Sequence, residues 1–202
     1  MRQLYDYINK HSYFLISDTD LEVIISHFAY KKIRRKQYFL QEGEVCTYLA
    51  FVIKGAMRQY FTDDKGIEHY MHLYIENGWV GDRESWVMCT PSIYNIDASE
   101  DSEIMLITRA NILKLMQLFP VFAEMVRRMD EETTIATQKR IVSTISFNAD
   151  RRYHAFANEY PHLLQRFPQR IIASYIGITK ETLSRVRNQY FQNRISRESH
   201  KI

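Results

Sequence analysis

The fold is decided by the stretch Gln169-Arg170-Ile171-Ile172-Ala173-Ser174-Tyr175-Ile176-Gly177-Ile178-Thr179-Lys180-Glu181-Thr182-Leu183-Ser184-Arg185-Val186. It predicts two short helices, at about 169–176 and 180–191, split by a turn at 177–179. Two helices joined in this way are typical of a helix-turn-helix, which places its second helix in the major groove of DNA. The alternative is an ordinary helical hairpin with a solvated charged face.

Three small residues meet the steric demands of a helix-turn-helix. Ala173 is small enough to let two steeply crossing helices touch. Gly177 reaches the left-handed conformation that stops the first helix. Thr179 can cap the second helix by accepting a hydrogen bond from an amide two or three residues further along. The turn therefore favours the motif over a loose hairpin.

The apolar and polar residues of the motif separate onto two faces. The positions that must point inward are all apolar: Ile172, Ile176, Ile178, Leu183 and Val186. The predicted DNA-contacting residues are Arg170, Thr179, Lys180, Glu181, Ser184, Arg185, Arg187 and Asn188. Arginine can form a two-pronged contact with guanine, and glutamate can accept from cytosine, so this face suits base recognition.

Charge is distributed unevenly along the 202 residues. Residues 150–202 hold 10 of the 27 Lys and Arg residues but only 4 of the 24 Asp and Glu residues. A basic C-terminal quarter behind an acidic body indicates a polyanionic partner. The apolar share of 46% and the charged share of 25% exclude a disordered chain and a collagen-like repeat.

Two cysteines, Cys46 and Cys89, stand 43 positions apart, which excludes a four-thiolate metal or iron–sulfur site within one chain. We expect two free thiols rather than a disulfide, as in a reducing compartment. No apolar run approaches the length of a membrane span, and no signal peptide begins the sequence. These features predict a cytoplasmic protein with no membrane partner.

The N-terminal two-thirds contain helices, then strands, then helices again. A short helix and a second one at about 18–29 precede short runs rich in Tyr, Phe, Val and Ile between Lys31 and Ile107. Turn signals at 8–12-residue intervals predict an antiparallel sandwich or barrel there, with a hairpin between Met57–Phe61 and Glu68–Tyr74. A short helix at 111–118 follows.

A long helix is predicted from about Val121 to Phe147. Its apolar or small stripe has steps of three and four residues, as in a coiled coil, and comprises Phe122, Met125, Met129, Thr133 and Ala136, with Ile141, Val142 and Ile145 near the end of the helix. Two interpretations remain open. The stripe can pack on the chain's own barrel as core, or it can also pair with a second copy in a homodimer.

The remaining segments predict a compact C-terminal domain. Residues 151–160 read as a helix and 161–167 as a loop before the helix-turn-helix. Only 11 residues follow Phe191. This is short for a two-stranded wing, so we expect a vestigial or missing wing, or a basic tail that touches phosphates.

With these segments in this order, the sequence resembles the Crp/Fnr family of bacterial transcription regulators over nearly its whole length. The resemblance implies an α+β chain with an antiparallel β-roll of the cyclic-nucleotide-binding, jelly-roll type at 1–120, flanked by helices. It further implies a dimerisation helix at 121–147 and a winged-helix-type helix-turn-helix domain at 148–202. Its partners would be double-stranded DNA, a second copy of the chain and RNA polymerase.

The family's recognition helix carries Arg-Glu-Thr-x-x-Arg, and this sequence reads Lys180-Glu181-Thr182-Leu183-Ser184-Arg185. By resemblance, Glu181 and Arg185 take base-reading roles. Lys180 replaces an arginine and cannot form the same fork, so we expect it to hold a phosphate.

The β-roll resemblance rests on Gly43-Glu44, Phe51-Val52-Ile53-Lys54-Gly55 and Gly78-Trp79-Val80-Gly81-Asp82. In cyclic nucleotide binders, a glutamate and an arginine about ten residues later hold the ribose and the phosphate. Here Asp82 replaces the glutamate and residues 89–95 hold no basic residue. The candidate effector pocket is Gly81, Asp82, Arg83, Glu84 and Ser85. An unpaired phosphate opposite carboxylates is unfavourable, so we predict that cyclic AMP does not bind.

The sequence leaves the effector open: another small molecule or none, with no cofactor identified. A cupin-like metal site is disfavoured because His69 and His72, three apart on a strand, face opposite sides of the sheet. No catalytic motif appears. We therefore predict a sequence-specific transcription regulator and not an enzyme. The alternatives are a dimeric ligand-binding module without DNA binding and, less favoured, a cupin-like metalloenzyme.

Overall fold

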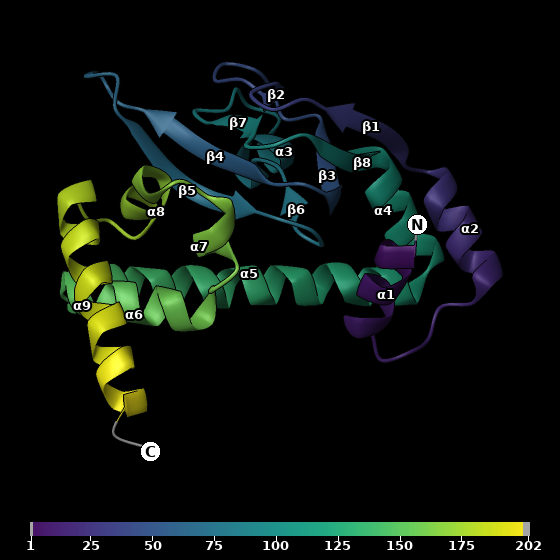
Figure 1. The fold of residues 1–202 in the computed structure, drawn as a ribbon. Coiled ribbons are helices and arrows are strands. Elements are labelled where there is room, and N and C mark those ends of the chain that lie inside the picture. The colour runs from purple at the N-terminus through teal and green to yellow at the C-terminus, as the bar shows by residue number, and fades with distance from the viewer. Residues whose placement is uncertain (1, 200–202) are drawn as a thin grey trace.

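Short antiparallel strands form a two-sheet roll in the N-terminal part of the computed structural model, which describes residues 2–199 (Figure 1). The strands are β1 (Ala29–Ile33), β2 (Tyr38–Leu40), β3 (Tyr48–Lys54), β4 (Met57–Thr62), β5 (Glu68–Tyr74), β6 (Trp79–Val80), β7 (Asn95–Ala98) and β8 (Ser102–Thr108). One sheet has the order β1-β8-β3-β6 and the other β2-β7-β4-β5. Every pairing is antiparallel, which confirms the predicted roll.

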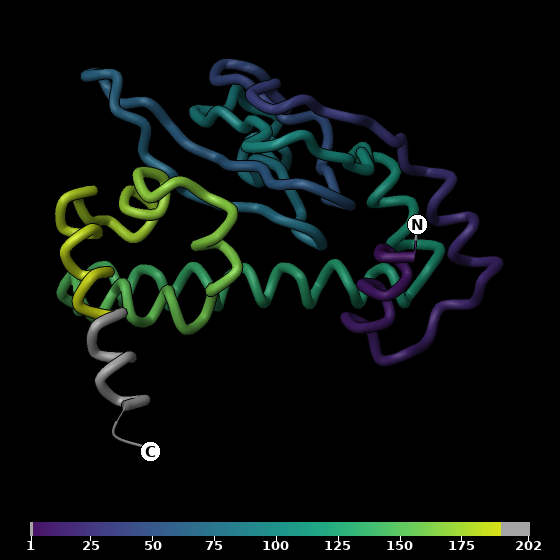
Figure 2. The backbone as a smooth tube through the Cα atoms, viewed as in Figure 1, coloured from purple at the N-terminus to yellow at the C-terminus, as the bar shows by residue number. Residues whose placement is uncertain are grey.

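Helices flank the roll and form the C-terminal domain. They are α1 (Arg2–Lys10), α2 (Asp18–Ser26), α3 (Arg83–Met88), α4 (Arg109–Leu118), α5 (Pro120–Ser146), α6 (Ala149–Glu159), α7 (Leu163–Arg166), α8 (Gln169–Tyr175) and α9 (Lys180–Ser199). The path of the backbone shows α5 running below the roll from the end near α1 to the end that carries α8 and α9 (Figure 2). In the described residues 2–199, no helix is both long and apolar enough to cross a bilayer.

Local sequence signals explain where several elements begin. The Ser17 side chain caps α2 by accepting from the amide of Asp20 at 3.1 Å. Pro120 stands in the first turn of α5, where its missing N–H costs nothing. The predicted hairpin is confirmed: β4 and β5 pair from Met57–Tyr74 to Thr62–Glu68, with a shift of register between Gln59 and Tyr60, around a turn closed by Asp63.

Two apolar clusters stabilise the molecule. The first fills the roll and includes Phe51, Ile104 and the start of α5. The second is the core of the C-terminal domain, and it also contains Tyr60 and Tyr70 of the roll. The C-terminal domain is therefore packed against strands β4 and β5, not merely tethered to the roll.

The structure corrects two predicted boundaries. The segment 161–167, expected as a loop, contains the short helix α7. The second helix of the motif, expected to end near 191, continues as α9 to Ser199, through Asn193, Arg194 and Ile195. A helix occupies the place where wing strands would begin, and no strand follows α9 within residues 2–199. The predicted tail beyond 199 lies outside the described residues.

Candidate DNA-binding face and effector cavity

The turn between α8 and α9 is a Schellman motif. Gly177 has a φ of +71°, and its amide donates to the Ser174 carbonyl at 3.1 Å. The Ile178 amide donates to the Ala173 carbonyl at 2.9 Å. These two bonds satisfy carbonyl groups that the end of α8 would otherwise leave unpaired. The expectation that Gly177 stops the first helix is confirmed.

The second helix begins with the predicted cap. The amide of Thr182 donates to Thr179 Oγ1 at 3.2 Å. From α6, the Arg152 guanidinium donates to the Gly177 carbonyl at 2.7 Å and to the Phe147 carbonyl at 3.0 Å. Arg152 thus fastens the turn of the motif to the end of α5, a contact that the sequence did not reveal.

Replacing Gly177 with alanine should destabilise the domain. Alanine at this position would have to keep the positive φ, which is disfavoured for a residue with a side chain. Its Cβ would lie 3.0 Å from the Arg152 side chain. We expect a loss of about 1 kcal/mol in the free energy of unfolding. Thermal unfolding checks this. The matched variant Ser184→Ala, on an exposed helical position, should leave the midpoint unchanged, and equal effects of the two substitutions would contradict the assignment.

Most of the predicted DNA-contacting residues are exposed on the surface of the motif. Arg170, Thr179, Lys180, Glu181, Ser184, Arg185 and Asn188 are all exposed, whereas Arg187 is half-buried. The inward positions are buried at Ile172, Ile176, Leu183 and Val186 and half-buried at Ile178. The surface of α9 therefore has the polar composition and the accessibility that a groove-reading helix needs.

Helix α8 rests directly on strand β5. The amide of Tyr70 donates to Ser174 Oγ at 3.2 Å, and Ser174 Oγ donates to the Glu68 carbonyl at 3.3 Å. Arg140 of α5 donates to the Met71 carbonyl and lies 5.0 Å from the Tyr175 ring centroid. One residue of the long helix thus contacts both strand β5 and the first helix of the motif.

A salt-bridge latch, consisting of Arg166, Glu76 and Glu100, joins the two domains at a second point. Arg166 of α7 donates to both oxygens of Glu76 at 3.1 Å and forms an ion pair with Glu100. Partial burial acts to raise the pKa of Glu76. The hydrogen bonds from Arg166 and from the Gly55 amide outweigh it, so the pKa lies below its usual range.

Replacing Arg166 with alanine should loosen the C-terminal domain. The side chains of the latch are about a third exposed. Solvent therefore screens them, and we expect a loss of only about 1 kcal/mol. Because the pKa of Glu76 is lowered by folding, the contribution is present above pH 4.5 and disappears as the pH falls below it. Hydrogen exchange of α7 and of the β5–β6 turn measures the effect.

Exchange in both segments should rise for Arg166→Ala and stay unchanged for Arg170→Ala, which removes the same charge from an exposed site. Unchanged exchange in Arg166→Ala would contradict the latch.

A cavity of about 430 Å³ lies between the roll and α5. Of the predicted effector residues, Gly81, Asp82, Arg83 and Glu84 line it. Ser85 does not line the cavity: its buried hydroxyl donates to the Thr90 carbonyl and accepts from the Cys46 amide. Ser85 therefore supports the loop around the cavity.

The beginning of α3 is already occupied by a carboxylate. Asp82 is 5% exposed, and its side chain accepts from the amide of Glu84 at 3.1 Å. Arg83, which precedes Glu84 on α3, turns to Asp130 of α5 and forms a two-pronged ion pair with it. The Glu84 amide and the Arg83 guanidinium are therefore already engaged by carboxylates of the chain itself.

The walls of the cavity are aromatic and acidic. Burial, with Glu132 as the next cause, raises the pKa of Tyr7 to about 12. Burial also raises the pKa of Tyr94, with further contributions from Asp82 and Glu84. Burial is thus the main cause of both raised pKa values, and the carboxylates at the cavity add to it.

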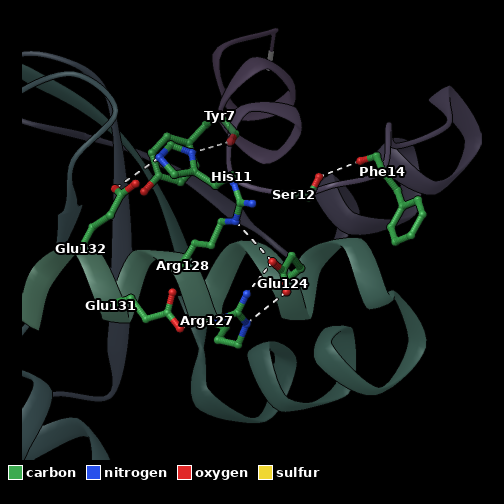
Figure 3. Close-up of polar contacts among 9 residues, drawn as sticks. All are labelled: Tyr7, His11, Ser12, Phe14, Glu124, Arg127, Arg128, Glu131 and Glu132. Atoms are coloured by element: carbon green, nitrogen blue, oxygen red, sulfur yellow. Dashed lines mark hydrogen bonds and ion pairs between the residues drawn. The ribbon is translucent and has the colours of Figure 1, made fainter.

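Helix α1 closes one side of the cavity against α5. Tyr7 and His11 stack with ring centroids 4.0 Å apart, and His11 Nε2 lies 3.4 Å from Glu132 (Figure 3). Nearer the beginning of α5, Arg127 and Arg128 both pair with Glu124. The ion pairs fix the helix segment from which Asp130 and Glu132 reach the cavity.

The residues of the stripe predicted on α5 differ in burial. Phe122 and Met125 are fully buried in the core of their own chain. Met129 and Thr133 line the cavity described above, and Ala136 lines a neighbouring one of about 330 Å³ beside the C-terminal domain. The start of the stripe is therefore core, whereas Thr133 and Ala136 are exposed, and the pairing of the stripe with a second copy stays a prediction.

A different side of α5 is apolar and uncovered. Ile135, Val142 and Ile145 are 52%, 55% and 79% exposed. Their spacing of seven and three residues places them on one side of a helix, roughly 120–200° around from Thr133, since successive residues are rotated by about 100°. The long helix thus has one side that packs on its own chain and one apolar side that the described chain leaves uncovered.

The residues considered for metal chemistry have other contacts. His69 Nε2 lies 2.9 Å from Asp63, and its ring stacks on Phe61. Burial, together with Arg140, lowers the pKa of His72 to about 4. Cys46 and Cys89 are free. In the part of the chain that the structure describes, no group of three or more His, Cys, Asp or Glu residues is placed to hold a metal ion.

Comparisons with known proteins agree with this architecture. Residues 30–118 match the family model of the cyclic nucleotide-binding domain. FixK2 from Bradyrhizobium japonicum is 18% identical, covers 82% of this chain and 85% of its own, and has a TM-score of 0.72. The Thermus thermophilus catabolite activator protein is 20% identical over 88% of this chain and 85% of its own, with a TM-score of 0.56.

A third solved structure is that of CLP from Xanthomonas campestris, described as a global regulator responsive to c-di-GMP. It is 14% identical, covers 88% of this chain and 93% of its own, and has a TM-score of 0.65. Among curated proteins, no match was found. Identities this low show a shared fold without showing a shared ligand.

Proposed function

Since this chain contains a cyclic nucleotide-binding domain and has the fold of the Crp/Fnr transcription regulators, we propose that it is a sequence-specific DNA-binding regulator with a small-molecule sensor in its roll. We further propose that it binds DNA as a homodimer and that it is not an enzyme. RNA polymerase is a further candidate partner by the same resemblance.

The observation that carries the proposal is the exposed polar side of α9, mounted on a fully formed turn. Glu181 and Arg185 lie one turn apart on this side and are exposed. The Schellman bonds at Gly177, the cap at Thr179 and the Arg152 clamp hold it rigidly. A rigid helix with accessible arginine and glutamate side chains can read base edges.

The exposed side of α5 supports the homodimer. A dimer about a two-fold axis along this side would cover Ile135, Val142 and Ile145. Each subunit would then present one α9, and the two recognition helices would enter successive major grooves roughly 34 Å apart.

Cyclic nucleotides do not suit the sensor cavity. Its carboxylates are Asp82, Glu84, Asp130 and Glu132, and its guanidinium, Arg83, is committed to Asp130. A phosphate there would lose its hydration next to like charges. We therefore propose that the roll senses a molecule that is not a cyclic nucleotide.

Selection of duplexes from a random library tests the proposed function. The purified full-length chain should enrich an inverted repeat whose half-sites are about one helical turn apart. Enrichment of no sequence, in the presence and absence of candidate effectors, would contradict sequence-specific binding. Enrichment of a single half-site would contradict the dimer alone.

A further inference from the structure

We propose that the cavity between the roll and α5 takes a small organic cation with an aromatic body and a hydrogen-bond acceptor. The proposal rests on the sensor role assigned above and names the class of molecule sensed. It follows from three features of the cavity: its charge, its aromatic walls and the unpaired buried indole donors of two tryptophans that line it, Trp79 and Trp86.

The charged residues that line the cavity determine whether it favours a cationic or an anionic ligand. Asp82, Glu84, Asp130 and Glu132 border the cavity, opposed by the single guanidinium of Arg83. Both terminal nitrogens of the Arg83 guanidinium already donate to the carboxylate of Asp130. The remaining carboxylates leave an excess of negative charge in a partly enclosed space, which favours a cation and disfavours an anion.

The aromatic rings that line the cavity favour a ligand with an aromatic ring of its own. Trp79, Trp86, Tyr7, Tyr74 and Tyr94 all line the cavity. Ring faces attract an ammonium group and also pack against an aromatic ring. A volume of about 430 Å³ accommodates a molecule with one or two rings.

An unsatisfied donor indicates a polar group on the ligand. Trp86 is 9% exposed, and its Nε1 is buried without a hydrogen-bond partner in the structure. Buried donors are normally paired, so such a group at the edge of a cavity calls for an acceptor. A ligand oxygen distant from the ammonium group supplies that acceptor.

The position of the carboxylates explains how such a ligand would act. Glu84 belongs to α3 of the roll, whereas Asp130 and Glu132 belong to α5. A cation between them competes with Arg83 for Asp130 and changes the contact between α3 and α5. Arg140, further along the same helix, contacts both β5 and Tyr175 of α8. A shift of α5 would therefore move the helices of the DNA-binding domain.

Intrinsic fluorescence reports on this cavity and on a smaller one of about 190 Å³ that both tryptophans also line, and the carboxylate variants below assign the signal to the larger one. The sequence has two tryptophans, Trp79 and Trp86, and both line the cavity. The full-length chain without DNA is titrated with tyramine, with its anionic counterpart phloretate and with its neutral counterpart phloretamide, using excitation that tyrosine does not absorb. Cyclic AMP and cyclic GMP complete the set.

Tyramine should half-saturate the tryptophan signal at a concentration at least about tenfold lower than phloretate does. The double variant Glu84→Gln, Glu132→Gln should abolish this preference and leave the response to phloretamide unchanged. Glu131→Gln is the matched control, because Glu131 neighbours Glu132 but pairs with Arg127 and does not line the cavity.

Equal responses to the three probes, a preference for phloretate or a cyclic nucleotide, or no response at any concentration would overturn the proposal. Because the titration contains no DNA, its outcome is independent of the selection experiment. A chain that binds tyramine but enriches no duplex would contradict the proposed regulator and leave the cation site standing.

Discussion

The variant Val142→Asp, Ile145→Asp should be a monomer that no longer binds an inverted-repeat site with dimeric affinity. Both side chains are more than half exposed on α5, and in a two-fold dimer each substitution removes two apolar contacts. Losing the burial of even one aliphatic pair costs about 3 kcal/mol, which weakens the dimer by at least about 100-fold. Facing carboxylates add repulsion.

Sedimentation of the two proteins at matched concentrations measures this. The control is Ile93→Asp, which places the same charge on an isoleucine that is 62% exposed in the roll. The control should sediment as the parent chain does. A dimeric α5 variant would show that this side of the helix is not the interface.

Arg185→Ala should weaken binding to the selected duplex by about 1–3 kcal/mol and relax the choice of base at one position. Arg185 is exposed on α9, beside Glu181 on the same side of the helix. A side chain that reads a base edge contributes specificity, whereas one that holds a phosphate contributes equally on every sequence.

Affinities for the selected duplex and for single-base variants of it separate these cases. Arg35→Ala removes the same charge from an exposed position on the roll and should change neither affinity nor specificity. An equal loss on all duplexes would identify Arg185 as a phosphate contact and contradict its base-reading role.

The helix-turn-helix was predictable from sequence because its constraints are local. A left-handed residue, a cap and a short apolar pattern all lie within the 18 residues of 169–186, and the structure confirms Gly177 and Thr179 in these roles. The hairpin of β4 and β5 was predictable for the same reason. Short-range backbone geometry depends little on what the rest of the chain does.

The surfaces of α5 were not predictable in the same way. Two apolar patterns share the helix, one through Met125 and Thr133 and one through Ile135 and Val142. Spacing alone does not say which of them the roll covers. Steps of three and four residues joined Phe122 and Met125, which the chain buries, with Val142 and Ile145, which it leaves exposed.

The walls of the cavity were also beyond the reach of local sequence reasoning. Asp82, Arg83 and Glu84 were identified from one short motif, but Tyr7 and Glu132 come from helices far away in the chain. Only the folded chain shows that Arg83 pairs with Asp130 and that Trp86 is buried without a partner. A count of acidic and aromatic residues cannot reveal where they meet.

The salt dependence of DNA affinity tests the central claim most directly. Fluorescence anisotropy of a labelled duplex carrying the selected site is measured with the full-length chain over a range of salt concentrations. The logarithm of affinity should fall linearly with the logarithm of salt concentration, with a slope that reflects several phosphate contacts per subunit. No binding in dilute salt, or an affinity that does not change with salt, would contradict the assignment of the exposed side of α9 to DNA.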